Sequence, residues 1–120
     1  MGLAGEQMKV IVAGDRNEHD REKVFMAIRS SGFEITEIVS GGASGVDFYG
    51  EAYAHSKEIP LKVFKADWKA YGKSAGPIRN GQMAFYADAL IAVWDGSSPG
   101  TKNMIEHMRK LKKPVFIFNY

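Results

Sequence analysis

The feature that most constrains this chain is a repeated alternation between short, continuous apolar runs and segments whose apolar residues have helical spacing. The first run, MKVIVA, is rich in β-branched residues and ends at Gly14. Such runs predict strands buried on both faces, as in parallel sheets that helices cover. The predicted strands are Met8–Ala13, Ile35–Ser40, Leu61–Lys65, Ala89–Trp94 and Pro114–Phe118.

The segments between these runs carry helix signals. Asp20 can cap the first helix, and Gly32 follows its end. Pro77 suits the first turn of the third helix, where its missing N–H would have no partner. The predicted helices are Arg21–Ser30, Asp47–Lys57, Pro77–Tyr86 and Thr101–Leu111. Residues 66–75 (Ala66–Ala75) are predicted to be irregular.

This order of elements predicts an α/β fold of the Rossmann type, with three α/β/α layers and a five-stranded parallel sheet in the order 3-2-1-4-5. A length of 120 residues fits one domain. We assign residues 8–120 to that domain and residues 1–7 to a disordered lead-in. Ligands of such sheets bind beyond the carboxyl ends of the strands, where the winding reverses. The loops after the first, second and fourth strands should therefore meet.

Composition excludes several kinds of function. The chain has no cysteine, which rules out disulfides and thiolate metal sites and fits a cytoplasmic location. Its three histidines lie far apart, so we expect no metal and no cofactor. No apolar run approaches the roughly 20 residues of a membrane span, and no signal peptide is visible. A net charge of +2 is too small to indicate nucleic-acid binding by itself.

The strongest candidate for ligand binding is the turn SGGASGVD between the second strand and the second helix. Glycines let a backbone approach a ligand closely and adopt positive φ, and a helix start attracts phosphate. The spacing matches neither the dinucleotide fingerprint nor a Walker A loop. The alternative is a plain tight turn, over which we favour ligand binding. The candidate residues are Ser40, Gly41, Gly42, Ala43, Ser44, Gly45 and Asp47.

A second candidate loop, DGSSPGT, lies between the fourth strand and the fourth helix. It supplies hydroxyl groups and a glycine that permits close approach. The alternative is that a serine merely caps the helix. Its expected proximity to the first loop favours a phosphorylated ligand held between the two. The candidate residues are Asp95, Ser97, Ser98, Gly100 and Thr101.

The segment that opens the third helix adds Arg79 and Asn80. An arginine in a first helical turn opposes the helix dipole, so its presence needs another reason. Its guanidinium can bind phosphate in a bidentate manner. Without the neighbouring motifs, a surface arginine would be the better interpretation.

The loop after the first strand contributes Gly14, Asp15 and Arg16. These residues lie at the predicted switch point, where they can contact a sugar or a base. An ion pair between Asp15 and Arg16 in solvent is an equal alternative.

The segment DWKAYGK interleaves aromatic residues with lysines, a pattern that can stack a base and hold a phosphate. The alternative is that Trp68 and Tyr71 pack the long loop onto the sheet. We favour packing for Trp68, and we take Lys73 as the better ligand candidate.

Four stretches carry a family resemblance that covers nearly the whole chain: VIVAGDRNEHD, VSGGASGVD, ADWKAYGKSAGPIRNGQM and ADALIAVWDGSSPGTKNM. Together they resemble the YspA/YpsA-related branch of the SLOG superfamily. This Rossmann-like group includes the lonely-guy enzymes and the DNA-processing DprA proteins. The resemblance implies a nucleotide-type ligand in the cleft described above. It also implies a homodimer or larger assembly, because lonely-guy proteins form dimers.

The resemblance also implies an activity. Lonely-guy phosphoribohydrolases cleave the base from a nucleoside monophosphate, using an arginine in an Arg-Lys-x-x-Met segment. Here Arg79 and Met83 match that segment, with Asn80 in place of the lysine. The catalytic candidates under this interpretation are Arg79, Asp47 and Asp15.

The second lonely-guy motif is a Gly-Gly-x-Gly-Thr loop followed directly by glutamates. Gly100 and Thr101 match the loop, but Asn103 and Met104 occupy the glutamate positions. The group expected to assist departure of the base is therefore missing.

Three functions compete. The leading hypothesis is a module that senses or sequesters a nucleotide derivative, with phosphates on the two glycine-bearing loops and on Arg79, and with Asp15 or Asp47 on a ribose hydroxyl. The second is a nucleotide N-glycosidase or phosphoribohydrolase at the same cleft. The third is single-stranded DNA binding like that of DprA, which the net charge argues against. We expect no membrane partner and no nucleic-acid partner.

Overall fold

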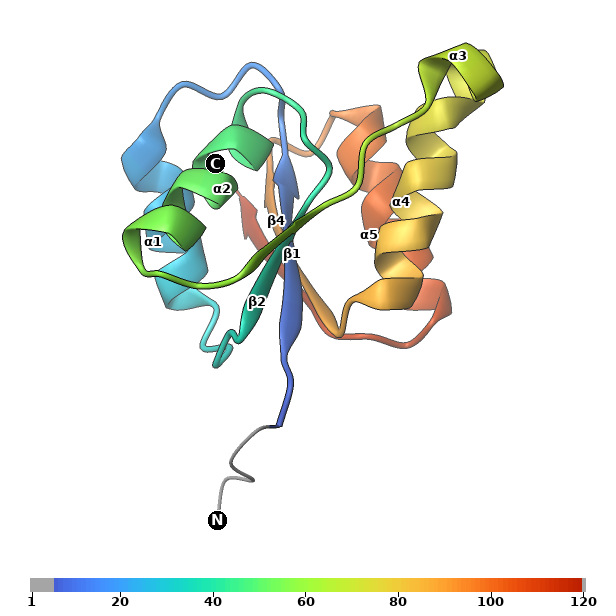
Figure 1. Ribbon diagram of the computed structural model, residues 1–120. Helices are drawn as coiled ribbons and strands as arrows, with labels where there is room; N and C mark the ends of the chain where they lie inside the picture. Colours follow the sequence, from blue (N-terminus) through green and yellow to red (C-terminus); the bar gives the residue numbers. More distant parts are fainter. Residues whose placement is uncertain (1–5, 120) are drawn as a thin grey trace.

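The computed structural model describes residues 6–119 and contains a parallel five-stranded sheet in the order β3-β2-β1-β4-β5 (Figure 1). This confirms the predicted fold class and strand order. The strands are β1 (Lys9–Gly14), β2 (Glu37–Ser40), β3 (Leu61–Val63), β4 (Ala89–Trp94) and β5 (Val115–Asn119).

Helices cover both faces of the sheet, with α1 and α2 on one side and α4 and α5 on the other (Figure 1). The helices are α1 (Arg21–Ser30), α2 (Val46–Ser56), α3 (Trp68–Tyr71), α4 (Ala75–Tyr86) and α5 (Pro99–Lys110), with a single 3₁₀ turn, η1 (Gly72–Ser74), between α3 and α4. The arrangement is the expected three-layer α/β/α sandwich.

The two central strands, β1 and β4, are continuous apolar runs because both of their faces are buried. Val10 and Val12 of β1 face the core beneath α1 and α2, whereas Ile11 faces the core beneath α4 and α5. All three side chains are fully buried. Because successive residues of a strand point to opposite faces, a strand covered on both sides needs apolar residues at every position.

The carboxyl ends of β1 and β4 lie side by side, and a glycine makes this possible. Gly14 is in register with Val93, and a Cβ added at Gly14 would lie 2.2 Å from the carbonyl oxygen of Val93. Only glycine permits this approach. The loops that follow both strands therefore start from the same edge of the sheet.

The prediction of an irregular stretch at residues 66–75 is wrong from Trp68 onward. The carboxylate of Asp67 accepts a hydrogen bond from the backbone N–H of Ala70 and caps the short helix α3, which leads through η1 into α4. As a result α4 begins at Ala75, not at Pro77. Arg79 lies in the second turn, so it does not oppose the helix dipole in the way that the sequence suggested.

Smaller differences concern the ends of elements and the lead-in. Helix α5 begins at Pro99, two residues before the predicted start, because proline suits the first helical position. The predicted lead-in falls mainly on residues 1–5, which lie outside the described residues.

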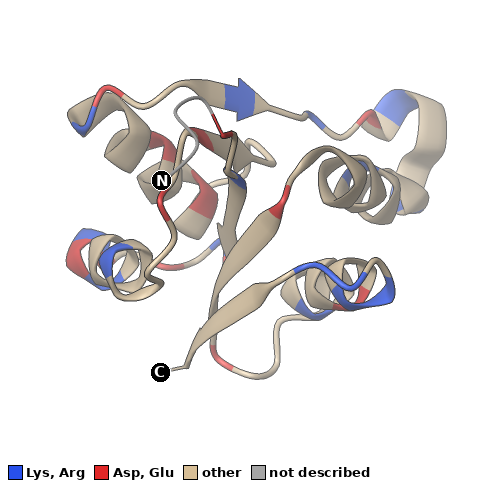
Figure 2. Ribbon diagram, turned by 90° about the horizontal axis from the view of Figure 1, so that it is seen from below, with Lys and Arg blue, Asp and Glu red and all other residues tan. Residues whose placement is uncertain are grey.

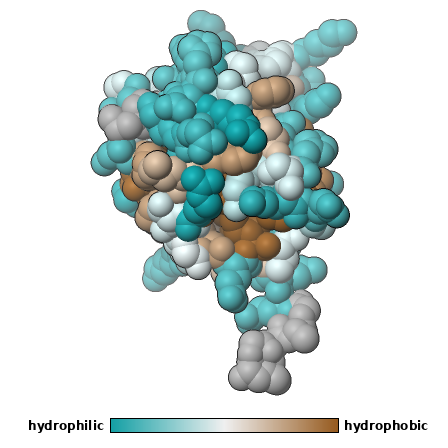
Figure 3. Space-filling model, turned by 90° about the vertical axis from the view of Figure 1, so that its left-hand side faces the viewer, coloured by the Kyte–Doolittle hydropathy of each residue, from teal (hydrophilic) through white to brown (hydrophobic). Residues whose placement is uncertain are grey.

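The outer surface over α1 and α2 is mixed, with hydrophilic residues over most of it and apolar patches between them (Figure 3). Such a mixture is ordinary for a folded domain. None of the helices in the described part of the chain combines the length and apolar character that a membrane span requires.

Candidate functional site

A cleft of about 330 Å³ opens at the carboxyl ends of β1 and β4. The loops after β1, β2 and β4 all contribute to its wall, as the strand order predicts. Helix α4 supplies one further side. We call this hollow the cleft; its lining residues are Ala13, Gly14, Asp15, Arg16, Ala43, Asp47, Arg79, Asn80, Met83, Ser98, Pro99, Gly100, Thr101 and Met104.

The glycine-rich loop between β2 and α2 clamps the loop that follows β1. Gly45 has a φ of +72°, and a Cβ added to it would lie 2.3 Å from the carbonyl oxygen of Asp15. The hydroxyl of Ser44 donates to the carbonyl oxygen of Arg16 at 3.0 Å, and the N–H of Val46 donates to that of Asp15 at 3.1 Å. This loop therefore fixes the backbone that carries Arg16.

Two backbone amides of the same loop already have partners inside the protein. The N–H of Gly42 donates to the hydroxyl of Ser40 at 3.0 Å, and the N–H of Ala43 donates to the carboxylate of Asp47 at 3.2 Å. The Ser40 hydroxyl in turn donates to Glu51 at 2.6 Å. The expected phosphate cradle is thus partly filled by the chain's own side chains.

Glu51 is a residue that the sequence reasoning missed. It lies four positions after Asp47 on α2, so both carboxylates point to the same side of the helix. That spacing was the available signal. The charge of Glu51 contributes to raising the pKa of Asp47.

Asp47 and Arg79 face each other across Gly41. A Cβ added at Gly41 would lie 2.8 Å from Nη1 of Arg79 and 2.9 Å from Oδ2 of Asp47. Nη1 of Arg79 donates to the carbonyl oxygen of Gly41 at 2.6 Å. The two side chains interact through their charges without forming a contact ion pair.

Burial dominates the ionisation of this pair. Asp47 is only 6% exposed, and burial raises its pKa from 3.8 to about 6, although the Ala43 hydrogen bond and the charge of Arg79 act in the opposite direction. Burial also lowers the pKa of Arg79, and the Asp47 charge opposes that shift. The cleft wall therefore holds a cation beside a carboxyl group that titrates near neutral pH.

Asn80 connects α4 to the first turn of α5. Its Oδ1 accepts from Nε of Arg79 at 3.1 Å, and its Nδ2 donates to Asn103 at 3.0 Å and to the carbonyl oxygen of Gly100 at 3.3 Å. Met104 is 1% exposed and lines the cleft. The two positions at which lonely-guy enzymes carry glutamates are thus occupied by an amide network and a core side chain.

The amino-terminal end of α5 opens toward the cleft without an acidic residue in its first turn. The carboxylate of Asp95 accepts from the N–H groups of Ser97 and Ser98, and these bonds lower the pKa of Asp95. Ser98, at the N-cap, makes no side-chain capping bond. Backbone amides in a first turn have no partner within the helix, so Gly100 and Thr101 lie where an anion can be bound.

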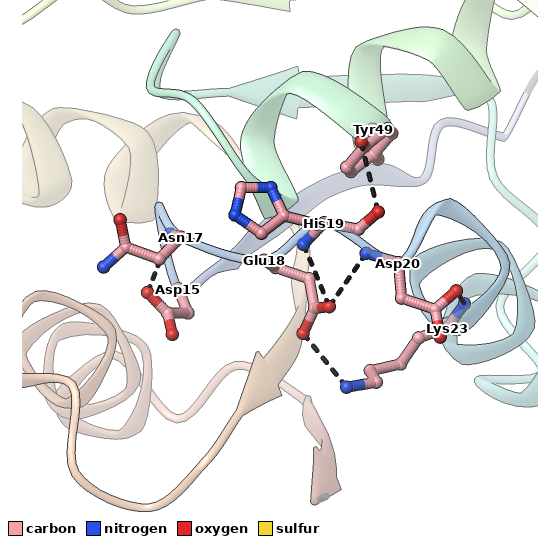
Figure 4. A network of polar contacts seen from close by, with 7 residues as sticks. All are labelled: Asp15, Asn17, Glu18, His19, Asp20, Lys23 and Tyr49. Carbon is pink, nitrogen blue, oxygen red and sulfur yellow. Dashed lines mark hydrogen bonds and ion pairs between the residues drawn. The ribbon is translucent and has the colours of Figure 1, made fainter.

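The loop that carries Arg16 is ordered by its own polar contacts (Figure 4). Asp15 accepts from the N–H of Asn17 at 2.9 Å, and Glu18 accepts from those of His19 and Asp20. Asp15 and Arg16 do not form the ion pair that was the alternative interpretation. Arg16 is exposed and lines the cleft.

A second hollow, of about 460 Å³, adjoins the cleft. We call it the side hollow. It shares Arg16, Ala43 and Arg79 with the cleft; its other lining residues are Gly41, Gly42, Ser44, Lys65, Ala66 and Trp68.

The structure brings most of the predicted site residues together, but not all. Those that line the cleft are Gly14, Asp15, Arg16, Ala43, Asp47, Arg79, Asn80, Ser98, Gly100 and Thr101, and those that line only the side hollow are Gly41, Gly42 and Ser44. Ser40, Gly45, Asp95 and Ser97 line neither hollow. Lys73 lies exposed on η1 and lines neither hollow. Residues 6–119 hold no cluster of three or more acidic or histidine side chains suited to a metal ion.

Comparisons with known proteins place the chain in a family. A family model described as the YspA, cpYpsA-related SLOG family matches residues 8–71. The Gene 61 protein of Mycobacterium phage D29 is 30% identical over an alignment 120 residues long. The alignment covers 92% of this chain and 95% of the phage protein.

A similar fold occurs in the X-ray structure of DNA processing protein A (DprA) from Streptococcus pneumoniae, with a TM-score of 0.75 and 20% sequence identity. The match covers 92% of this chain but 50% of that chain, so the protein corresponds to about half the length of DprA. On the family match and the phage relative, the chain belongs to the YspA, cpYpsA-related SLOG family.

Proposed function

We propose that the cleft binds a nucleotide or another phosphate-bearing nucleotide derivative, and that the protein acts as a sensor or sequestering module for it. The observation that carries the proposal is the convergence of Arg16, Arg79 and the acid-free start of α5 on one hollow. Two guanidinium groups and a helix start all favour an anion.

The phosphate is assigned to the α5 side of the cleft and not to the α2 side. Helix α2 carries Asp47 in its first turn, and with a pKa of about 6 this carboxylate is mostly ionised at neutral pH. It repels a phosphate at that helix end. The N–H groups of Gly42 and Ala43 are already bonded within the loop. Neither obstacle exists at Gly100 and Thr101 of α5.

The remaining cleft wall suits the sugar of such a ligand. Asp47 presents a carboxylate that can accept a hydrogen bond from a ribose hydroxyl, and Met83 and Met104 supply apolar contacts. A volume of about 330 Å³ lies at the lower end of the usual range for small-molecule sites.

Calorimetric titration with adenosine monophosphate tests the proposal. Arg16→Ala should weaken binding about tenfold, because a charge-assisted contact to phosphate is lost while the exposed side chain supports no other group. Arg109→Ala is the matched control, since it removes an exposed arginine at the far end of α5. Failure of all four common nucleoside monophosphates to bind the unaltered protein at millimolar concentration would contradict the proposal.

A second candidate function is hydrolysis of the glycosidic bond, and the ionisation of Asp47 favours it. In that reaction water replaces the base on the ribose carbon, and the base leaves with a proton. A buried carboxyl group with a pKa of about 6 is suited to such proton transfer near neutral pH. Chromatographic detection of free base from a nucleoside monophosphate tests this function. Loss of release in Asp47→Asn would support it, whereas release that survives Arg79→Ala would indicate a contaminant.

The similarity in fold to DprA makes an oligonucleotide a worthwhile third ligand to titrate. Figure 2 shows Lys and Arg on several separate elements and not along one continuous stripe. Binding of single strands normally requires a basic groove. Tight oligonucleotide binding that falls steeply with salt would favour nucleic acid over a free nucleotide.

A further inference from the structure

The side hollow is continuous with the cleft through Arg16, Ala43 and Arg79, which line both. A phosphate held by the two arginines therefore lies at a junction, from which the rest of a ligand can extend in either direction. No residue that lines the cleft is aromatic, whereas the side hollow has Trp68 in its wall.

Trp68 does not pack the loop onto the sheet, contrary to the interpretation that its sequence context favoured. Its side chain is 56% exposed, on a helix in which no residue is buried. Trp94, the other tryptophan, behaves differently: it packs against the core, and its indole N–H donates to the carbonyl oxygen of Ser98 at 3.1 Å. One indole therefore has a structural role, and the other lies exposed in the wall of the side hollow.

Lys65 gives the side hollow a third cation. It follows β3, is exposed, and makes no ion pair. A planar ring beside cationic groups is the usual environment for a nucleobase attached to a phosphate. By contrast, the cleft places the Asp47 carboxylate and two methionines opposite the arginines.

We infer that the side hollow is the base subsite of the nucleotide ligand, with the base stacked on Trp68 and Lys65 at its edge. The phosphate then lies between the two arginines and the start of α5, and the sugar, beside Asp47, joins it to the base. This inference rests on the proposed function and specifies its ligand class further. Because stacking grows with ring area, purine nucleotides should bind more tightly than pyrimidine nucleotides.

The test compares adenosine monophosphate with ribose phosphate, which lacks the base. Trp68→Ala should weaken binding of adenosine monophosphate about thirtyfold, the middle of the range for removal of one base–aromatic stack, and should leave ribose phosphate unchanged. Trp68→Phe should restore part of the loss. Tyr71→Ala is the matched control, because Tyr71 is 51% exposed on the same short helix and lines neither hollow.

The outcomes separate this inference from the proposed function. If adenosine monophosphate binds the unaltered protein and Trp68→Ala equally well, the base subsite is wrong and the phosphate site stands. Equal weakening of both ligands by Trp68→Ala would also overturn the base subsite, because the indole would then support only the shape of the hollow. If neither ligand binds the unaltered protein, the proposed function itself fails.

Discussion

The junctions β2–α2 and β4–α5 look alike in sequence but differ in what they leave open. Both are glycine-bearing loops that lead from the carboxyl end of a strand into a helix at the same edge of the sheet. The second residue of α2 is Asp47, whereas the second residue of α5 is Gly100. The first junction turns its carboxylate onto its own backbone, and the second has no acidic residue at that place.

The difference teaches that a glycine-rich turn before a helix can have two distinct roles. The β2–α2 junction holds neighbouring loops together, since Gly45 packs against Asp15 and Arg16 and the N–H of Ala43 is bonded to Asp47. In the β4–α5 junction Asp95 binds the N–H groups of Ser97 and Ser98, whereas Gly100 and Thr101 line the cleft at the start of α5. Composition alone does not distinguish these roles. They are distinguished by the acceptor to which each backbone N–H of the junction donates.

The largest expected effect is on stability. It comes from a substitution that separates the β2–α2 loop from the loop after β1. Gly45→Ala places a Cβ 2.3 Å from the carbonyl oxygen of Asp15 at a φ of +72°, so the two loops must separate. We expect a loss of more than about 3 kcal/mol in the free energy of unfolding, measured by urea denaturation.

Gly96→Ala in the other junction is the control for that substitution. Gly96 also has a positive φ, +91°, but an added Cβ meets nothing within 4 Å. The cost should be only the backbone strain, about 1 kcal/mol. Equal losses of unfolding free energy for both variants would show that the β2–α2 junction does not hold the loop after β1 in place.

The second prediction concerns the two carboxylates of these junctions, whose pKa values shift in opposite directions. Because the pKa of Asp47 is raised from 3.8 to about 6 in the folded protein, its contribution to stability is complete below pH 3.8 and is lost as the pH rises through 6. That loss amounts to about 3 kcal/mol at most. Asp47→Asn should therefore gain stability relative to the unaltered protein as the pH rises across this window.

Urea denaturation at a series of pH values measures that difference, and Asp95→Asn provides the opposite case. The pKa of Asp95 is lowered by its bonds to Ser97 and Ser98, so its contribution is present above pH 3.8 and is lost as the pH falls below it. A stability difference for Asp47→Asn that does not change with pH would contradict the burial argument.

The smallest expected effect comes from making the two helix ends alike. Gly100→Asp gives α5 a carboxylate at the position that Asp47 occupies in α2, and nothing lies within 4 Å of the added Cβ. Binding of adenosine monophosphate should weaken about tenfold by repulsion, which corresponds to about 1.4 kcal/mol. The fold should remain intact, because an acidic residue in a first turn stabilises a helix.

Gly100→Asn is the neutral control for that experiment. It matches aspartate in size and should keep most of the affinity in the same calorimetric titration. If both variants bind equally weakly, the effect is steric, and the assignment of the phosphate to the α5 end loses its electrostatic basis.

The fold was predictable from sequence to a large extent, and for a definite reason. The runs around Val10 and Leu90 are apolar at every position because both faces of these strands are covered. The meeting of three loops at one edge then follows from the strand order. The helix α3 was missed because only a four-residue helix capped by Asp67 forms there, which is too short to show periodicity.

The candidate site was predictable in its location but not in its internal connections. The sequence indicated Arg79, Asp47 and both glycine-bearing loops, and these lie around the two hollows. It misplaced Lys73 and Trp68, because the packing of α4 decides which residues of α3 and η1 line the side hollow. It also missed Glu51, whose partner Ser40 lies on another element.

What the sequence determined by itself was the layered architecture and the edge of the sheet at which chemistry can occur, because apolar periodicity and chain order are local properties. The tertiary structure decided which helix start lines the cleft without an acidic residue in its first turn and which tryptophan lies exposed in the wall of a hollow. These features depend on hydrogen bonds between residues that are far apart in the chain, such as Arg79 with Gly41 and Asn80 with Asn103. Only the folded chain brings such pairs together.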